Sequence, residues 1–369
     1  MIEPRFTKMA EVLVDYSLEI KTGDKFLIES TDLATPLIKA IYRTALVRGA
    51  HPEVQLQPEG LAGIYYDHAS EEQLRYISPL REKVILEYDA FLALKADHNT
   101  KALTNADSSK IALRQRASAP LNQRFMERAA QGEMRWCVAL YPTQSLAQEA
   151  AMSLDEYAEF VMEACLLNTP DPVAAWQAVH DRQQRYTEFL NGVDVIEVKA
   201  KDTDLRLRVK GRTWENCDGK MNFPDGEVFT APIEDSVEGV IRFSFPGIYS
   251  GKEVEDIRLT FEQGKVVKAT AAKGEELLHS LLETDAGARR VGEFAIGTNF
   301  GITEFTRNML FDEKIGGTIH LALGSTYFET GGKNESGIHW DMLCDMRDGG
   351  EIYADGKLIY RNGHMLVEE

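Results

Sequence analysis

The pattern of apolar residues changes at Asn191-Gly192, and this change constrains the fold more than any other feature of the sequence. Before it, short apolar runs such as residues 25–29 and 89–95 alternate with helical patterns such as residues 109–131. Strands that are separated by helices need crossover connections, which are typical of a parallel sheet. We therefore predict an α/β domain with a mainly parallel, Rossmann-like sheet for residues 1–191.

After Gly192, strand patterns dominate the sequence. Residues 193–199 alternate apolar and polar side chains, and a hairpin is expected over residues 257–268 around the turn Gln263-Gly264. The second half, residues 192–369, is therefore predicted to be an α+β domain rich in antiparallel strands, with the metal-binding candidates described below. The first half contains neither G-x-G-x-x-G nor a Walker A motif, so a nucleotide site is not expected.

The charge of the chain excludes one large class of partners. With 41 basic and 59 acidic residues, the formal net charge is −18, which repels phosphate backbones, so no nucleic-acid partner is expected. No stretch approaches the ~20 apolar residues of a membrane span, and the N-terminus lacks the long apolar core of a signal peptide. The four scattered cysteines are typical of free thiols in a reducing compartment. We predict a cytoplasmic protein without membrane contact.

A first candidate metal ligand is His320, in the alternating segment 317–324. On a strand, Ile319 and Leu321 lie on one face, while His320 lies on the other face between small residues that leave room around its ring. The alternative for His320 is a half-buried structural histidine without a ligand.

A second candidate is the pair His339 and Asp341, in the segment 337–343. A spacing of two on a strand places both side chains on one face, where they can bind one cation or two neighbouring cations. The alternative is a surface His–Asp pair. Trp340 and Met342 on the opposite face indicate a packed strand, which argues against that alternative.

Three further residues complete the candidate set. Tyr327 lies in the polar, glycine-containing loop between the two histidine strands, where its hydroxyl could donate a hydrogen bond to an oxyanion. Glu227 and Glu293 adjoin apolar residues, where a carboxylate is costly unless it is paired or bound to a metal. Spacing alone does not select these two acids from the 59 acidic residues of the chain.

The ligand types favour particular ions and exclude particular enzymes. Two histidines with carboxylates suit Zn²⁺, Co²⁺ or Mn²⁺. The sequence has no H-E-x-x-H helix, which excludes a zincin, and no G-x-S-x-G elbow, which leaves a serine hydrolase unsupported.

Five ordered segments resemble the aminopeptidase T and aminopeptidase S family, metallopeptidase family 29. The resemblance is carried by NFPDGEVFTAP (222–232), FSFPGIYSG (243–251), GEFAIGTN (292–299), FDEKIGGTIHLALG (311–324) and IHWDM (338–342). The N-terminal half resembles the family more loosely, in its length and its order of helices and strands. The chain looks shorter than the longer family members, which affects the shape of the entrance rather than the metal site.

The resemblance implies a dinuclear metal-dependent aminopeptidase. The family's metal ligands fall on Glu227, Glu293, His320, His339 and Asp341, and its active-site tyrosine falls on Tyr327. With two divalent ions (Zn, Co or Mn), such an enzyme hydrolyses the N-terminal residue from a peptide with a free N-terminus through a metal-activated water. We expect Glu293 to bridge the ions, which with Tyr327 makes it a catalytic residue. The resemblance also implies a homodimer.

Two other functions remain as alternatives. His320, His339 and Asp341 could form the two-histidine, one-carboxylate triad of a mononuclear non-haem iron oxygenase on a related scaffold. Glu227 and Glu293 argue against it, because one iron needs no further acids. A non-catalytic metal-binding protein is the other alternative, although structural metal sites are usually closed and rich in thiolates.

Overall fold

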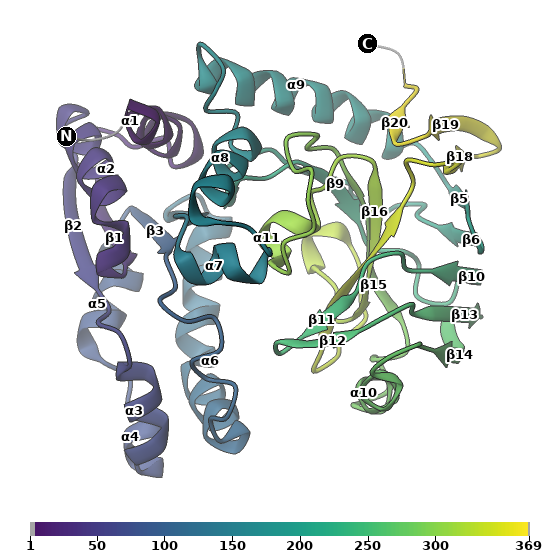
Figure 1. Ribbon diagram of the computed structural model, residues 1–369, viewed down its shortest axis with the longest axis horizontal. Coiled ribbons are helices and arrows are strands. Elements are labelled where there is room, and N and C mark those ends of the chain that lie inside the picture. The colour runs from purple at the N-terminus through teal and green to yellow at the C-terminus, as the bar shows by residue number, and fades with distance from the viewer. Residues whose placement is uncertain (1–3, 368–369) are drawn as a thin grey trace. The chain divides into compact units, whose positions relative to one another are not determined.

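The computed structural model describes residues 4–367, which divide into two compact units (Figure 1). The first unit comprises the residues up to Trp176 together with Gly219–Pro224. The second comprises Gln177–Asp218 and the residues from Asp225 onward. The chain passes from one unit to the other inside helix α9 (Pro172–Leu190). The domain boundary that we expect at residue 191 stays a prediction.

The first unit is built on a five-stranded sheet in the order β2-β1-β3-β4-β8, in which every pairing is parallel. Apolar side chains such as Phe26, Ile28 and Leu92 are fully buried in it, as is typical of a parallel sheet that helices cover. The predicted α/β class is thus confirmed. The strands are β1 (Lys25–Ser30), β2 (His51–Leu56), β3 (Ala90–Lys95), β4 (Arg135–Leu140) and β8 (Asn222–Phe223).

Helices connect these strands, and their first turns follow from local sequence. Ser153 forms a capping box with Glu156 at the start of α8, and Pro36 stands in the first turn of α2, where its missing N–H costs nothing. After α1 the chain continues as a π-helical turn (Val12–Ser17). The helices are α1 (Pro4–Glu11), α2 (Thr35–Val47), α3 (Leu61–His68), α4 (Glu71–Arg75), α5 (Pro79–Glu87), α6 (Ser108–Ala130), α7 (Gln144–Glu149) and α8 (Leu154–Ala164).

The second unit contains two antiparallel sheets that share one core. An eight-stranded sheet has the order β14-β13-β10-β6-β5-β18-β19-β20, and a five-stranded sheet has the order β17-β16-β15-β9-β7. Side chains of the larger sheet, such as Ile196 and Leu205, lie in one buried cluster with Phe294, Ile319 and Met342 of the smaller sheet. The predicted antiparallel α+β domain is therefore confirmed, and the hairpin around Gln263-Gly264 forms as β13 and β14.

The elements of the second unit have the following bounds. The larger sheet consists of β5 (Val195–Ala200), β6 (Thr203–Arg208), β10 (Glu238–Arg242), β13 (Arg258–Glu262), β14 (Lys265–Thr270), β18 (Glu351–Ala354), β19 (Lys357–Arg361) and β20 (His364–Met365). The smaller sheet consists of β7 (Glu215–Cys217), β9 (Glu227–Thr230), β15 (Val291–Gly297), β16 (Thr318–Gly324) and β17 (His339–Asp345). The part of α9 from Gln177 onward also belongs to this unit. A two-stranded ribbon and two further helices are β11 (Gly247–Tyr249), β12 (Lys252–Val254), α10 (Glu275–Leu282) and α11 (Met309–Asp312).

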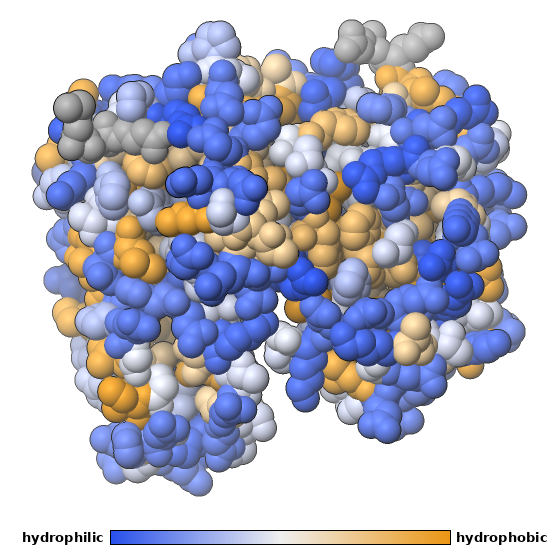
Figure 2. Space-filling view, in the orientation of Figure 1, coloured by the Kyte–Doolittle hydropathy of each residue, from blue (hydrophilic) through white to orange (hydrophobic). Residues whose placement is uncertain are grey.

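The surface is mostly hydrophilic, as the net charge of −18 leads one to expect. On the face that Figure 2 shows, hydrophobic residues form patches among hydrophilic ones. Within residues 4–367, no helix combines the length and the apolar character that crossing a bilayer requires.

Candidate metal centre

The five predicted ligands lie on four neighbouring strands of the smaller sheet, β9, β15, β16 and β17. Leu321 and Met342 point into the core between the two sheets, so the histidines on the same strands point to the opposite face. Ala322 stands directly between Glu293 and Asp341 in the register of β15, β16 and β17. Its small side chain leaves space between the two carboxylates.

The ligand side chains form a continuous series of short contacts with Glu293 at its centre. Glu293 Oε1 lies 3.3 Å from His320 Nε2, and Glu293 Oε2 lies 3.3 Å from His339 Nε2. His339 Nε2 lies 3.5 Å from Asp341 Oδ2, and His320 Nε2 lies 3.6 Å from Glu227 Oε2. Each oxygen of one carboxylate thus faces a different histidine, and each histidine faces a second carboxylate.

Burial divides the site into a closed end and an open end. His320 is 1 % exposed, and Glu227 and Glu293 are both 4 % exposed. The side chain of His339 is 27 % exposed. A second molecule can therefore approach this group from the side of His339.

The charges of the site set its protonation in the ion-free chain. Burial disfavours the imidazolium of His320, but the hydrogen bond to Glu293 and the charges of Glu227 and Glu293 outweigh it and raise the pKa of His320 to about 9. Burial of His339 is likewise outweighed by its hydrogen bonds to Asp341 and Glu293, which raise its pKa to about 11. The same contacts hold the pKa of Asp341 at about 2 and lower the pKa of Glu293, although burial acts in the opposite direction on both.

The donor set fits a divalent cation. Among the described residues, Glu227 Oε2 and Asp341 Oδ1 are buried side-chain oxygens without a hydrogen-bond partner. His339 Nδ1 lies 2.8 Å from the carbonyl oxygen of Ser325, to which it can donate, and this bond turns Nε2 towards the carboxylates. Ligand atoms of Glu293, His339 and Asp341 lie within 4.8 Å of one another. Unpaired oxygens beside an oriented imidazole are what a bound cation would satisfy.

Tyr327 lies at the open end of the group. It is 46 % exposed, and its ring makes edge contacts with the rings of His339 and Phe229, at centroid distances of 5.1 Å and 5.4 Å. Partial burial of the side chain and the nearby charge of Glu293 raise the pKa of Tyr327 above its usual range. The phenol therefore keeps its proton and can act as a hydrogen-bond donor at neutral pH.

The loop that carries Tyr327 is fastened to the chain just after β9. The Arg212 guanidinium donates to the carbonyl oxygen of Gly331 and, at 2.7 Å, to Glu234 Oε2. The other oxygen of Glu234 accepts from the N–H of Lys333 at 2.7 Å. One ion pair thereby holds Gly331 and Lys333, which follow Tyr327 in the loop.

Two charged residues of this centre were not among the sequence predictions. Lys314 Nζ lies 3.4 Å from Glu227 Oε1 and 2.5 Å from Glu313 Oε2, and the side chain of Lys314 is 3 % exposed. Burial raises the pKa of Glu313 to about 8, while the charges of Glu227 and Glu313 outweigh burial and keep Lys314 charged, with a raised pKa. Both residues belong to the segment FDEKIGGTIHLALG, which also contains His320. Their position in this segment is the sequence feature that could have identified them.

A second group of ligand-type residues adjoins the first. Atoms of Cys217, Asp225 and Glu227 lie within 4.8 Å of one another. Burial and the charge of Asp225 raise the pKa of Cys217 well above its usual value, so its thiol keeps its proton. Lys314 already supplies a positive charge beside Glu227, so this group resembles a metal site less than the Glu293 group does.

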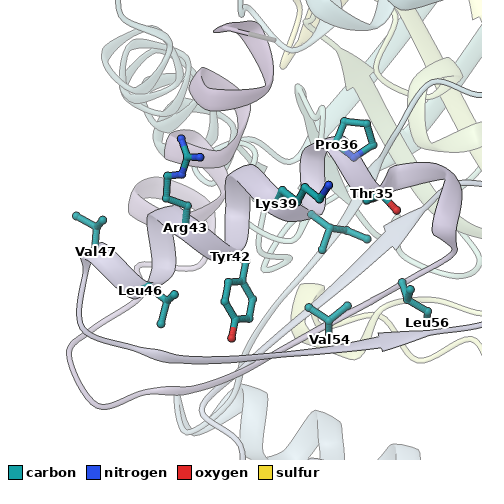
Figure 3. A pocket seen from close by; sticks show the side chains of 10 residues that line it. Thr35, Pro36, Lys39, Tyr42, Arg43, Leu46, Val47, Val54 and Leu56 are labelled. Atoms are coloured by element: carbon teal, nitrogen blue, oxygen red, sulfur yellow. The ribbon is translucent and has the colours of Figure 1, made fainter. Parts of the chain in front are cut away.

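A groove in the first unit has a different character. It has a volume of about 1070 Å³ and lies between α2 and β2, where Figure 3 shows Tyr42, Leu46, Val54 and Leu56 around it. Its lining contains no histidine, cysteine or carboxylate. The groove therefore offers no place for a metal ion.

Gly226 is needed for the position of Glu227. Its φ of +127° is unfavourable for other residues, and a Cβ there would lie 2.7 Å from Cβ of Asn299. We expect Gly226→Ala to lower the free energy of unfolding by at least about 2 kcal/mol. Chemical denaturation measures this. Gly63→Ala, in α3 with open space around it, is the control and is expected to be neutral or slightly stabilising. Equal losses in both variants would contradict the steric account.

Several known proteins are similar to the chain over nearly its whole length. Aminopeptidase 2 of Geobacillus stearothermophilus is 29 % identical to the chain, over 99 % of the chain and 98 % of the relative. Aminopeptidase T of Thermus thermophilus is 28 % identical over 98 % of both proteins. The solved structure of wild-type AmpT from Thermus thermophilus superposes with a TM-score of 0.84 at 26 % identity, covering 99 % of the chain and 100 % of that structure.

A more distant structure shares the fold alone. It is 2,5-dihydroxypyridine dioxygenase from Pseudomonas putida KT2440, with a TM-score of 0.58 at 15 % identity over 99 % of the chain and 97 % of that structure. The family model described as thermophilic metalloprotease (M29) matches residues 2–365, nearly the whole sequence. With the antiparallel sheet that gathers two histidines and three carboxylates, this match shows that the chain belongs to the thermophilic metalloprotease (M29) family.

Proposed function

We propose that the chain is an aminopeptidase that binds two divalent cations and removes the N-terminal residue from peptides. The observation that carries the proposal is the position of Glu293, whose two carboxylate oxygens each lie 3.3 Å from a different histidine. Such a carboxylate can serve two ions at once. The relatives named aminopeptidase support the proposed reaction. The description of the family as metalloproteases supports the requirement for metal ions.

Each ion would have its own set of ligands. Glu293, His339 and Asp341 form the more exposed set, and their ligand atoms lie within 4.8 Å of one another. Glu227 and His320 form the buried set, which Glu293 completes from the other side. The mixture of imidazole and carboxylate ligands suits Zn²⁺, Co²⁺ or Mn²⁺.

Bound ions of this kind supply a nucleophilic water at neutral pH and polarise the scissile carbonyl. Beside the ions, side chains of the protein can supply hydrogen-bond donors. Tyr327 keeps its proton at neutral pH, so its O–H can donate to the oxygen that becomes negative as the carbonyl carbon turns tetrahedral.

The reaction is tested with a panel of matched peptides. Each peptide is offered with a free and with an acetylated N-terminus, and the products are identified by mass spectrometry. An aminopeptidase releases single residues from the free peptides only. Cleavage of internal bonds, or equal cleavage of acetylated peptides, would refute the proposal.

We also propose a cytoplasmic homodimer. The four cysteines are free thiols, three of them buried, which supports a reducing compartment. The dimer rests on the family resemblance of the sequence. Light scattering coupled to size-exclusion chromatography should give twice the chain mass of 41.4 kDa, and a mass of one chain at micromolar concentration would contradict it.

Neither alternative function is favoured. The dioxygenase shares the fold at 15 % identity, and a fold does not determine a reaction. A single iron would leave Glu227 and one further carboxylate without a role, although both lie in the same series of contacts. A purely structural metal would not need the exposed end that His339 and Tyr327 form.

Metal affinity should rise steeply with pH. In the ion-free chain His320 and His339 are protonated at pH 7, because their pKa values of about 9 and 11 lie above it. A metal binds the neutral imidazole, so loading both ions at pH 7 must release about two protons, one from each histidine, and the affinity for each ion should increase by up to ~10-fold per pH unit below pH 9. Titration with Co²⁺ at pH 6, 7 and 8 measures the slope. An affinity independent of pH would show that these histidines are not ligands.

A further inference from the structure

Gln183 is fully buried in α9, although most of its neighbours in the sequence are polar or charged. Its side chain leaves the helix and reaches the smaller sheet at β9, which lies below α9 in Figure 1. Gln183 Nε2 donates to the carbonyl oxygens of Cys217 at 2.9 Å and Glu227 at 3.2 Å. The backbone of a predicted metal ligand is therefore bonded directly to this amide.

The other contacts of Gln183 extend across the sheet. Nε2 also lies 2.7 Å from Asn216 Oδ1, so its two hydrogens are shared among three acceptors, and Oε1 accepts from Thr298 Oγ1 at 2.5 Å. Asn216 lies in β7, Glu227 begins β9, and Thr298 directly follows β15. One side chain thus joins three neighbouring strands at the edge where Glu227 stands.

The hydrogen-bonded ladder between β9 and its neighbouring strands is short at this edge. The β9–β15 pairing has four residue pairs and ends at Glu227 opposite Gly297, and β7 has only three residues. Terminal pairs of short ladders open most easily, because fewer bonds hold them. The N–H of Thr298 bonds to the carbonyl oxygen of Gly226 at 2.8 Å, so Gln183 reinforces the pair that follows the ladder end. A displacement here would move Glu227 relative to Glu293.

We propose that Gln183 is a positioning residue of the metal centre, which fixes the backbone of Glu227 against β15 so that Glu227 and His320 keep the spacing for one ion. This inference rests on the proposed function, because it needs the five residues to bind metal. Gln183 itself does not contact the ligand atoms. Its effect is carried through the main chain of Cys217 and Glu227, to whose carbonyl oxygens it donates.

The test compares two buried polar residues of one helix. Gln183→Met keeps the size of the side chain but removes every hydrogen bond to the sheet. Thr187→Val is the matched control: Thr187 is 2 % exposed in the same helix, but its hydroxyl donates to the carbonyl oxygen of Gln184, inside α9. The ion-free full-length chains are titrated with Co²⁺, and the visible absorption, the number of ions bound and the unfolding temperature without metal are recorded.

We expect Gln183→Met to weaken the affinity for Co²⁺ by roughly 10- to 100-fold at one of two sites, as is typical for residues that orient ligands. Thr187→Val should leave the affinity within about twofold of the wild type, whatever its unfolding temperature. If Gln183→Met does not fold, Gln183→Glu serves instead, because it retains an acceptor for Thr298 and loses the amide that bonds to the carbonyl oxygen of Glu227.

The outcomes separate the inference from the proposed function. Wild-type affinity in the Gln183 variant, with only a lower unfolding temperature, would reduce Gln183 to a structural residue and overturn the inference alone. Equal loss of affinity in Thr187→Val would overturn it as well. A wild-type chain that binds no Co²⁺ would overturn the proposed function and this inference with it.

Discussion

Replacing Glu293 by glutamine is expected to lower kcat/KM by about 10³-fold and to reduce the number of bound ions from two to one or none. Among residues 4–367, Glu293 is the one carboxylate that contacts both histidines, so its charge would serve both ions. The amide has nearly the same shape, so the change removes charge rather than volume. A 10³-fold loss corresponds to about 4 kcal/mol of transition-state stabilisation, within the several kcal/mol that metal sites supply.

The measurement combines peptide hydrolysis with metal analysis of the purified protein. Glu276→Gln is the control, since it removes the same charge from an exposed position on α10 and should change neither quantity. A Glu293 variant that retains both ions and near-normal turnover would remove this residue from the centre.

Tyr327→Phe should produce the second large effect, a fall in kcat of about 10²- to 10³-fold with both ions retained. This is the usual cost of removing one hydrogen-bond donor from an oxyanion site. The ring contacts with His339 and Phe229 would persist in phenylalanine, so the geometry of the ligands should not change. KM should vary little, because the donor acts on charge that appears only in the transition state.

Phe328→Leu is the control for the Tyr327 variant, because Phe328 neighbours it in the loop and is exposed. It should retain most of the activity. If Tyr327→Phe loses metal, or loses activity no more than Phe328→Leu does, Tyr327 is a residue of the loop structure rather than a donor to the reaction.

Alternation along single strands predicted the face of the sheet on which His320, His339 and Asp341 lie. The pattern of β16 and β17 placed Leu321 and Met342 on one face and the histidines on the other, and the structure has them so. That information is local, because side chains on a strand alternate with period two. The division into a parallel and an antiparallel part could be predicted for the same reason, from apolar runs and their spacing.

Residues whose roles depend on distant pairing could not be found in this way. Nothing local in the sequence places β15 between β9 and β16, so Glu227 and Glu293 entered the predictions mainly through the family resemblance. Glu313 and Lys314 read as solvated charges, whereas they form a buried ion pair beside Glu227. Gln183 has polar neighbours in the sequence and reads as part of a solvated helix face. Strand β8 joins the first unit although it lies far along the chain. It has only two residues, which is too short for a recognisable strand pattern.

The most direct test of the account is a crystal of the chain grown with Co²⁺ or Zn²⁺ and measured at the absorption edge of the metal. We expect two anomalous peaks about 3.5–4 Å apart, with Glu293 between them, Glu227 and His320 on one, and His339 and Asp341 on the other. A single peak away from Glu293, or ions bound only at other residues, would contradict the proposed dinuclear centre.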